Sequence, residues 1–248
     1  MLALWLLQRR TGDAGVADVG WALGVGLLSA VVLLDAGGPV TRRLAVAALV
    51  GAWSLRLGTH LLVDRVLSPG EDGRYQTLRE KWGDRAQGKL LVYFLAQVPL
   101  IVLFSLPAWA LGNSPAPLAG WDWAGIAVSL VALMGERAAD RQLAAHRADP
   151  GNRGRTCRTG LWSYSRHPNY FFEWLYWCGL AAMALGASHG WVGLLPPLLL
   201  YYLLRRVTGI PYTEMRAVAR RGEDYRQYQR TTSAFFPWFP RDRKGVTP

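Results

Sequence analysis

The chain has 248 residues, of which 51% are hydrophobic and 12% aromatic, and its 28 Lys and Arg against 17 Asp and Glu give a formal net charge of +11. This composition is too apolar and too aromatic for an intrinsically disordered protein. The apolar residues are gathered into long runs instead of being spaced at the period of an amphipathic helix or strand, which argues against a set of soluble domains.

Six runs that are almost free of charge predict membrane spans. They are residues 19–34, 44–63, 90–112, 118–134, 170–187 and 191–204. Several approach the ~20 residues that a bilayer-spanning helix needs, and the shorter ones have Trp and Tyr in their flanks, as interfacial segments do. We therefore expect an all-α polytopic bundle of six to seven transmembrane helices, forming one domain over residues 1–248.

The first apolar segment, residues 2–7, is too short to cross a bilayer. It lacks the basic start and the small-residue cleavage site of a signal peptide. Two interpretations stay open: an interfacial segment, or the end of a helix whose upstream part is absent from this chain.

The distribution of basic residues predicts the orientation. Residues 65–89, residues 137–166 and the tail after residue 204 are rich in Lys and Arg, whereas residues 113–120 and 187–190 contain neither. The positive-inside rule then places the three basic regions and both termini in the cytoplasm of a bacterial-type inner membrane. Arg42 and Arg43 are the one basic pair on the opposite side.

Several function classes lack their sequence signals. No zinc-finger, helix-turn-helix or RNA-binding pattern accompanies the basic residues, so we expect no nucleic-acid partner. The four histidines, at positions 60, 146, 167 and 189, do not have the spacing of metal ligands, and we expect no metal site. A Gly-x-Gly-x-x-Gly fingerprint, a Walker loop and a Gly-x-Ser-x-Gly elbow are also missing from the sequence.

The densest polar constellation begins where the fourth predicted span leaves the membrane. On a helix, Glu136, Asp140, Leu143 and Arg147 fall on one stripe at spacings of four, three and four. This stripe presents two carboxylates and a guanidinium together. The alternative is a solvated amphipathic extension with an intrahelical ion pair.

An arginine-rich loop follows at residues 149–160. It contains Arg153, Arg155 and Arg158 among glycines. Arginine donates bidentately to phosphate oxygens, and glycine permits a close backbone approach. The loop therefore predicts a phosphate-binding segment.

The fifth predicted span starts with Pro168, which suits the first turn of a helix, and His167 or Ser165 lies near its cap. Asn169 and Glu173 are then one turn apart on one face, just inside the membrane boundary. Such groups are costly there unless they are paired or face a polar cavity, which indicates a site. The alternative is a helix start with snorkelling polar groups.

In the tail, Gly209 and Pro211 are expected to end the sixth span and let the following segment, with Glu214, fold back under the cavity. Arg205 lies at the end of that span.

Three segments carry a resemblance to a known family: Asp140-Arg-Gln-Leu, the block Gly-Leu-Trp-Ser-Tyr-Ser-Arg-His-Pro-Asn-Tyr-Phe-Phe-Glu-Trp from Gly160, and Gly-Glu-Asp-Tyr-Arg-Gln-Tyr-Gln-Arg-Thr-Thr-Ser-Ala-Phe-Phe-Pro-Trp from Gly222. With Glu71-Asp-Gly-Arg-Tyr, they make the chain resemble the DUF1295 branch of the steroid 5-alpha-reductase superfamily. The resemblance implies a helical membrane protein that holds NADPH in a cytoplasm-facing cavity. It also implies reduction of a carbon–carbon double bond conjugated to a ketone, with most cofactor motifs in residues 136–240.

The resemblance implies specific cofactor contacts. By motif, they are Asp140, Arg147, Arg155, Asn169 and Glu173. We expect four more residues to contribute: Glu136, which stands where the steroid enzymes have a polar amide, His167 as a helix cap or phosphate donor, Arg205 and Glu214.

The group that polarises the substrate carbonyl is less well specified. The steroid enzymes use a Glu in an early span and a Tyr beside a His. Here the early carboxylate is Asp18, and His60 is followed by Leu61, so Tyr75 or Tyr164 stand as alternatives. We expect Asp18 to be protonated because burial near the membrane disfavours its charge. A helix-capping role is the alternative for this residue.

Two other functions remain open. The Arg-His-Pro block and the acidic tail are also similar to those of S-adenosylmethionine-dependent isoprenylcysteine and phospholipid methyltransferases. A non-catalytic lipid-binding protein would have an apolar cavity without a nucleotide. For the reductase, we expect a monomer whose partners are membrane lipids and a lipophilic substrate, steroid-like or another lipid, that enters from the bilayer.

Overall fold

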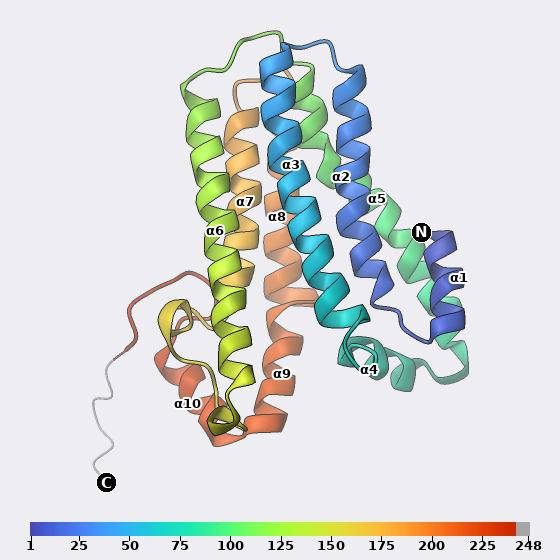
Figure 1. Cartoon of the computed structure of the whole chain (residues 1–248), viewed down its shortest axis with the longest axis vertical. Helices are drawn as coiled ribbons and strands as arrows, with labels where there is room; N and C mark the ends of the chain where they lie inside the picture. The colour runs from blue at the N-terminus through green and yellow to red at the C-terminus, as the bar shows by residue number, and fades with distance from the viewer. Residues whose placement is uncertain (242–248) are drawn as a thin grey trace. The chain divides into compact units, whose positions relative to one another are not determined.

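A computed structural model describes residues 1–241, and this part of the chain is helical, without a β-strand (Figure 1). The chain divides into two compact units. Unit 1 comprises Met1–Gly120 with Ala184–Gly193, and unit 2 comprises Trp121–Met183 with Leu194–Pro248, of which residues 242–248 lie outside the described range. The expectation of a single domain over residues 1–248 stays a prediction.

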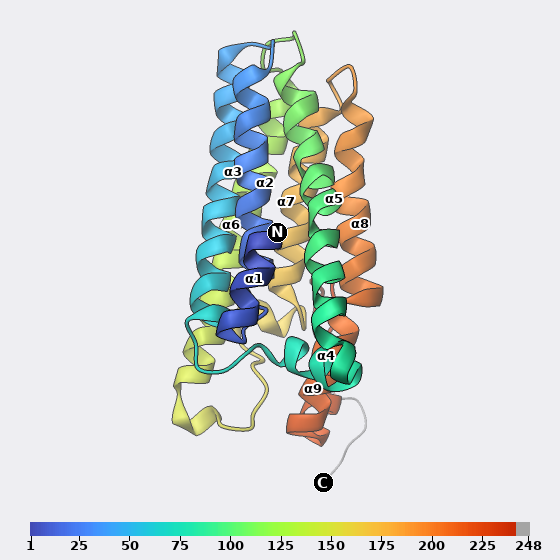
Figure 2. The same ribbon diagram turned by 90° about the vertical axis from the view of Figure 1, so that its right-hand side faces the viewer.

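Unit 1 is built on three long helices. Its helices are α1 (Leu2–Thr11), α2 (Val16–Asp35), α3 (Val40–Leu61), α4 (Gly73–Trp82) and α5 (Ala86–Gly112). A π-helical turn, Leu62–Val66, continues α3. Helix α2 packs against both α3 and α5, and the short α1 lies against α5 and α2 (Figure 2).

Small residues let the helices of unit 1 approach closely. A Cβ on Gly26 would lie 2.2 Å from Ser54 Oγ, and a Cβ on Gly58 would lie 2.7 Å from the side chain of Leu23. Ser54 Oγ also donates a hydrogen bond to the carbonyl oxygen of Ala22 at 2.9 Å. Contacts of small residues and interhelical hydrogen bonds are the means by which helices associate in lipid, where the hydrophobic effect between them is weak.

Three helical segments are long and apolar enough to cross a membrane: Val16–Asp35, Val40–Val66 and Gly73–Gly112. They contain the first three predicted spans, and many outward side chains on them are exposed and apolar, such as Leu27 and Leu34. The protein is therefore a polytopic helical membrane protein. The other three predicted spans overlap helices of unit 2, and their crossing of the membrane stays a prediction.

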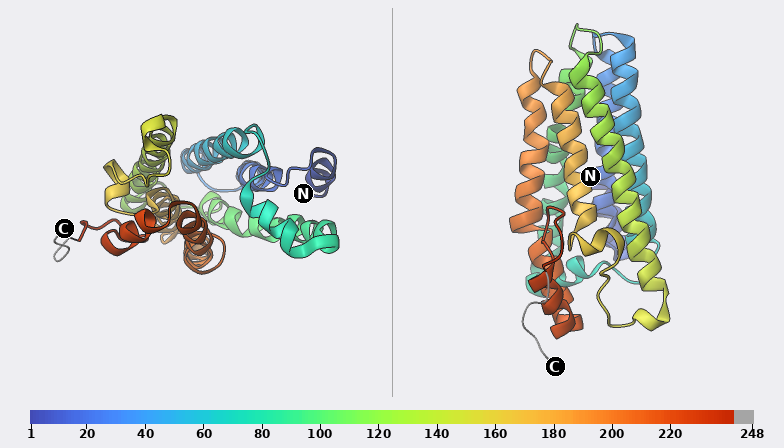
Figure 3. Two further views of the ribbon diagram at one scale, coloured as in Figure 1. Left: turned by 90° about the horizontal axis from the view of Figure 1, so that it is seen from below. Right: turned by 90° about the vertical axis from the view of Figure 1, so that its left-hand side faces the viewer.

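Unit 2 contains α6 (Gly120–Ala148), α7 (Pro168–Ala184), α8 (Leu195–Tyr202), α9 (Ile210–Arg221) and α10 (Glu223–Thr231). Helices α6 and α7 run side by side (Figure 3). Their backbones nearly touch, because a Cβ on Gly179 would lie 2.8 Å from the carbonyl oxygen of Gly125 and 2.9 Å from the amide nitrogen of Ser129. This contact fixes the depth at which the polar ends of the two helices meet.

Two predicted helix boundaries of unit 2 are confirmed, the start of a helix at Pro168 and the break at Gly209 and Pro211. Helix α7 begins at Pro168, and the segment that starts at α8 ends after a π-helical turn, Leu203–Val207. Gly209 then caps α9, which has Pro211 in its first turn. Proline lacks the amide hydrogen that a preceding helix would need, so the chain starts a new helix here.

The C-terminal tail is held by an aromatic cluster of unit 2. The ring of Phe235 lies 5.8 Å from that of Trp174 on α7 and 5.4 Å from that of Tyr201 on α8. Ser165 Oγ donates a hydrogen bond to the carbonyl oxygen of Phe235 at 2.9 Å. The tail is thereby fixed beside the start of α7.

Candidate functional site

The first of two polar clusters lies in unit 1, at the start of α2. Oδ2 of Asp18 lies 2.5 Å from a guanidinium nitrogen of Arg65 and 2.5 Å from one of Arg74. The other carboxylate oxygen, Oδ1, accepts a hydrogen bond from the hydroxyl of Tyr75 at 3.0 Å. Both oxygens of Asp18 are therefore engaged by donors.

The expectation of a protonated Asp18 is wrong. Two guanidinium groups at hydrogen-bond distance favour the carboxylate strongly over the acid. The side chain of Asp18 is 15% exposed, so solvent screens these ion pairs only in part. Asp18 is consequently an acceptor that orients its neighbours, and the structure gives it no proton to donate.

Local structure aims both arginines at Asp18. Asp72 caps the N-terminus of α4 by accepting a hydrogen bond from the backbone amide of Arg74 at 2.8 Å. A carboxylate oxygen of Asp72 also lies 3.6 Å from Arg65 Nε and the other 3.4 Å from Arg74 Nε. The capping residue thus restrains the two guanidinium groups that surround Asp18.

Tyr93 is a member of this cluster that sequence reasoning missed. Its hydroxyl lies 3.3 Å from that of Tyr75, and the two rings meet edge to face at 5.7 Å. Tyr75 is fully buried, whereas Tyr93 is half-buried. A tyrosine in an apolar run, three residues after Leu90 on α5, carries no sequence signal that separates it from an ordinary core aromatic residue.

The other candidate, Tyr164, belongs to unit 2. Its side chain is exposed, and its ring contacts that of Phe239 at 5.9 Å. Its backbone oxygen accepts a hydrogen bond from the amide of Trp238 at 2.9 Å. These contacts connect Tyr164 to the tail.

The second polar cluster lies in unit 2. Helix α6 continues through Ala148, so Glu136, Asp140 and Arg147 lie on one helix as predicted. Asn169 Nδ2 of α7 donates a hydrogen bond to Asp140 Oδ1 at 3.3 Å. The structure therefore brings together two residues that the sequence places 29 positions apart.

Two acidic residues of this cluster are buried. Glu136 is 4% exposed on α6, and Glu173 is 8% exposed on α7. Glu173 Oε1 accepts a hydrogen bond from the indole nitrogen of Trp177, one turn further along α7, at 3.1 Å. Buried carboxylates of this kind are retained where they are bonded or where they serve a site.

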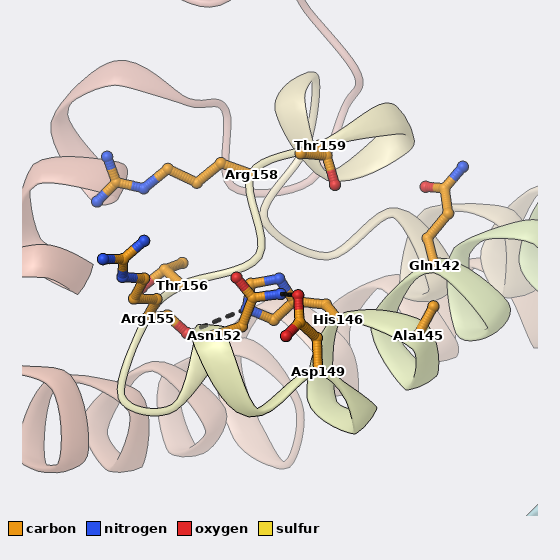
Figure 4. A pocket seen from close by; sticks show the side chains of 9 residues that line it. All are labelled: Gln142, Ala145, His146, Asp149, Asn152, Arg155, Thr156, Arg158 and Thr159. Atoms are coloured by element: carbon orange, nitrogen blue, oxygen red, sulfur yellow. Dashed lines mark hydrogen bonds between the residues drawn. The ribbon is translucent and has the colours of Figure 1, made fainter.

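A cavity of about 470 Å³ opens between the end of α6 and the arginine loop (Figure 4). The residues that line it are Gln142, Ala145, His146, Asp149, Asn152, Arg155, Thr156, Arg158 and Thr159. In Figure 4 the guanidinium groups of Arg155 and Arg158 extend to the same side of the cavity. Gly154 turns the loop just before Arg155 with a φ of +75°, which glycine adopts without strain.

The loop is held in place by α10. The hydroxyl of Thr156 donates a hydrogen bond to Asp224 Oδ2, and its amide donates to the same oxygen at 2.8 Å. Arg158 lies 2.7 Å from Asp224 Oδ1. Within residues 1–241, the guanidinium of Arg155 forms no ion pair, so it is available to an anion that enters this cavity.

Three further residues near the start of α7 form an ion-pair network. Arg166 Nε lies 2.6 Å from Glu214 Oε1, and the Nε2 atom of His167 lies 3.2 Å from the same oxygen. Burial opposes ionisation of Glu214, but the hydrogen bonds from His167 and Arg166 outweigh it and lower its pKa from 4.5 to about 2. Burial lowers the pKa of His167, against the opposing effect of Glu214. Glu214 is therefore an anion, held in place by the cation of Arg166 and by a neutral His167.

The predicted cofactor residues thus separate into groups within unit 2. Arg155 lines the cavity of Figure 4, Asp140 pairs with Asn169, and His167 pairs with Glu214. Arg205 lines a different cavity, beside the tail. No group of three or more His, Cys, Asp or Glu that could hold a metal ion occurs among the described residues.

Comparison with known proteins identifies the family at the level of the whole chain. The family described as "Protein of unknown function (DUF1295)" matches residues 4–232. The chain belongs to the DUF1295 family. No curated protein and no solved structure matches it. In this DUF1295 protein the match covers the unit 1 cluster, the arginine loop and the start of the tail.

Proposed function

We propose that this DUF1295 protein is an NADPH-dependent reductase of a carbon–carbon double bond conjugated to a carbonyl in a lipophilic substrate. The observation that carries the proposal is the cavity beside the arginine loop, where Arg155 and Arg158 extend to the same side. When bound, NADPH supplies a hydride. The enone substrate class rests on the family resemblance.

The lining of this cavity suits a phosphate-bearing group. Among the described residues, the guanidinium of Arg155 forms no ion pair. Arg158 pairs with Asp224, but its side chain is 30% exposed and retains donors for a second contact. The hydroxyl of Thr159 and the ring nitrogens of His146 add further hydrogen-bonding groups. Arginine donates to phosphate in a bidentate geometry, and its charge strengthens each hydrogen bond.

Asp140 and Asn169 supply a different kind of contact. Their side chains meet at 3.3 Å, and Asn169 Oδ1 is already used by the backbone amide of Tyr170 at 3.0 Å. The carboxylate of Asp140 is half-buried and can accept from hydroxyl or amide groups. We assign it to the ribose or amide portion of the cofactor, where acceptors are required.

In unit 1, Tyr93 is the proposed proton donor, and its neighbour Tyr75 positions it. Tyr75 is fully buried, so the half-buried Tyr93 is the hydroxyl that a substrate oxygen can reach. Because Tyr75 donates its single proton to Asp18, Tyr93 keeps its own proton for the carbonyl oxygen of the substrate, where negative charge develops. Asp18 orients Tyr75 and pairs with both Arg65 and Arg74.

One titration distinguishes the reductase from a methyltransferase. Purified protein is titrated with NADPH, NADH and S-adenosylmethionine in parallel. Only the first carries a 2′-phosphate, so the reductase is expected to bind NADPH more tightly than NADH and to bind S-adenosylmethionine weakly. Saturable binding of S-adenosylmethionine without binding of NADPH would reject the proposal.

A further inference from the structure

The second cavity of unit 2 lies beside the tail and has a volume of about 370 Å³. Four arginines line it, Arg166, Arg205, Arg230 and Arg241, and no carboxylate does so among the described residues. Thr231, Thr232 and Ser233 belong to the same lining. Cations and neutral donors without an acid are the composition of an anion site.

Two of the four positive charges are not neutralised by ion pairs. Arg166 pairs with Glu214, and Arg230 pairs with Glu223 on α10. Arg205 and Arg241 form no ion pair within residues 1–241. The cavity therefore carries a local positive charge of about two, which the proposed cofactor loop does not use.

Aromatic side chains stand at the rim of this cavity. Trp238 is 71% exposed and Phe239 75% exposed, and both line the cavity with Phe236. Exposing this much aromatic surface to water is unfavourable. Adjacent exposed aromatic side chains therefore indicate a site that contacts a ligand, a protein or a membrane.

The exposure of these rings comes from an ordered backbone. The amide of Trp238 donates to the carbonyl oxygen of Tyr164 at 2.9 Å, and the amide of Arg241 donates to that of Thr231 at 2.9 Å. Phe235, three residues before Trp238, is fully buried. The tail segment is thus fixed at both ends, with its aromatic rings directed outward.

We propose that this cavity binds the phosphate of an anionic phospholipid headgroup, with Trp238 and Phe239 in the interfacial layer of the bilayer. A phospholipid is the ligand that presents an anionic phosphate and an apolar chain at the same place. A soluble phosphate would leave the aromatic rim in water. Tryptophan beside arginine is also the pairing that membrane–water interfaces favour.

Fluorescence quenching by brominated lipids tests the proposal on the full-length protein. The protein is reconstituted into phosphatidylcholine bilayers with a minor share of phosphatidylglycerol, and either lipid carries bromine on its acyl chains. The chain has 12 Trp, so the signal of Trp238 is taken as the difference between wild type and Trp238→Phe. We expect brominated phosphatidylglycerol to quench this signal more strongly, per mole of lipid, than brominated phosphatidylcholine.

Matched charge variants assign the preference to the cavity. We expect Arg241→Gln to lower the preference for phosphatidylglycerol about fivefold, the effect of about one kcal/mol per arginine near an anionic surface. Arg226→Gln is the control, because Arg226 is exposed on α10 and does not line the cavity. Thermal unfolding of each variant shows whether it is folded, and unchanged NADPH binding by Arg241→Gln separates this site from the proposed cofactor site.

Three results would overturn the lipid assignment. The first is equal quenching by the two lipids. The second is an equal loss of preference in Arg226→Gln and Arg241→Gln, which would indicate general surface charge. The third is release of the lipid preference by millimolar inorganic phosphate at constant ionic strength, which would indicate a site for a soluble anion.

Discussion

The hydroxyl of Tyr75 donates a hydrogen bond to Oδ1 of Asp18 at 3.0 Å, although 57 positions separate the two residues in the chain. This contact connects the start of α2 to α4. Asp18 therefore accepts the hydrogen bond that orients Tyr75. The hydroxyl of Tyr93 lies next to this pair, 3.3 Å from that of Tyr75.

Removing the Tyr93 hydroxyl is expected to lower turnover without changing cofactor affinity. A general acid contributes about 10²–10⁴-fold to a rate, and we expect Tyr93→Phe to lose at least the lower end of that range in kcat for an enone substrate. NADPH affinity, measured in parallel, should stay within twofold. Leu95→Ala, which trims an exposed side chain on the same helix, is the control. Full turnover by Tyr93→Phe would contradict the assignment.

Neutralising Asp18 is expected to destabilise unit 1. In Asp18→Asn, Arg65 and Arg74 remain charged in a half-buried place and lose the carboxylate of Asp18, while the longer contacts with Asp72 remain. A fully buried pair costs ~3–5 kcal/mol when one partner is removed, and we expect about 2 kcal/mol here because the site is partly exposed. Asp84→Asn, at an exposed position, should stay within about 0.5 kcal/mol. Thermal unfolding in detergent measures both, and equal effects would argue against the ion pairs.

Arg155 is expected to contribute to the affinity for the 2′-phosphate. We expect Arg155→Gln to weaken NADPH binding about tenfold, since a charge-assisted hydrogen bond contributes about 1.5–3 kcal/mol. Binding of NADH, which lacks the 2′-phosphate, should change less. Arg153→Gln makes the same charge change two residues away, at an exposed position outside the cavity lining. Equal losses in the two variants would show a general charge effect.

The Glu214 network predicts a pH dependence of stability. The pKa of Glu214 is lowered to about 2 from 4.5, so its ionised form stabilises the fold above about pH 4.5, and this contribution is lost as the pH falls toward 2. The thermal midpoint of wild type should therefore fall more steeply between these values than that of Glu214→Gln. Because other carboxylates titrate in the same range, the difference between the two curves is the measured quantity. Parallel curves would refute the network's role in stability.

The space around two helical glycines predicts opposite effects when each is replaced by alanine. In Gly179→Ala the new Cβ would lie 2.8 Å from the backbone oxygen of Gly125, and overpacking of this kind costs about 1–3 kcal/mol. In Gly51→Ala, on α3, no atom lies within 4 Å of the new Cβ, and a helical Gly-to-Ala change stabilises by about 0.5–1 kcal/mol. Thermal unfolding of both variants checks the contrast, which would fail if Gly179→Ala were neutral.

The predicted orientation can be checked by cysteine accessibility. Probes at Asn113 and Ser188 are expected to be labelled from outside intact cells and a probe at Asp149 from inside only, because the loops around the first two lack Lys and Arg. The background replaces Cys157 and Cys178 with serine. The reverse labelling pattern would invert the proposed topology.

The class of the protein could be predicted from the sequence because span length and apolar composition are local properties. Uncharged runs near 20 residues can satisfy their backbone in lipid only as helices, and the helices α2, α3 and α5 lie where such runs occur. The positions of two helix starts could also be predicted from the local sequence. Pro168 and Pro211 lack an amide hydrogen, and each lies in the first turn of a helix.

The pairing of charged groups was decided only by the tertiary structure. Asp18 was expected to be protonated because burial near the membrane disfavours its charge, yet Arg65 and Arg74 reach it from 47 and 56 positions away. In the same way, Arg155 and Arg205 were both expected to bind the cofactor but line different cavities. The charge state and ligand of a polar side chain depend on neighbours within a few ångströms, and in a helical bundle those neighbours come from distant parts of the chain, which no local pattern of residues encodes.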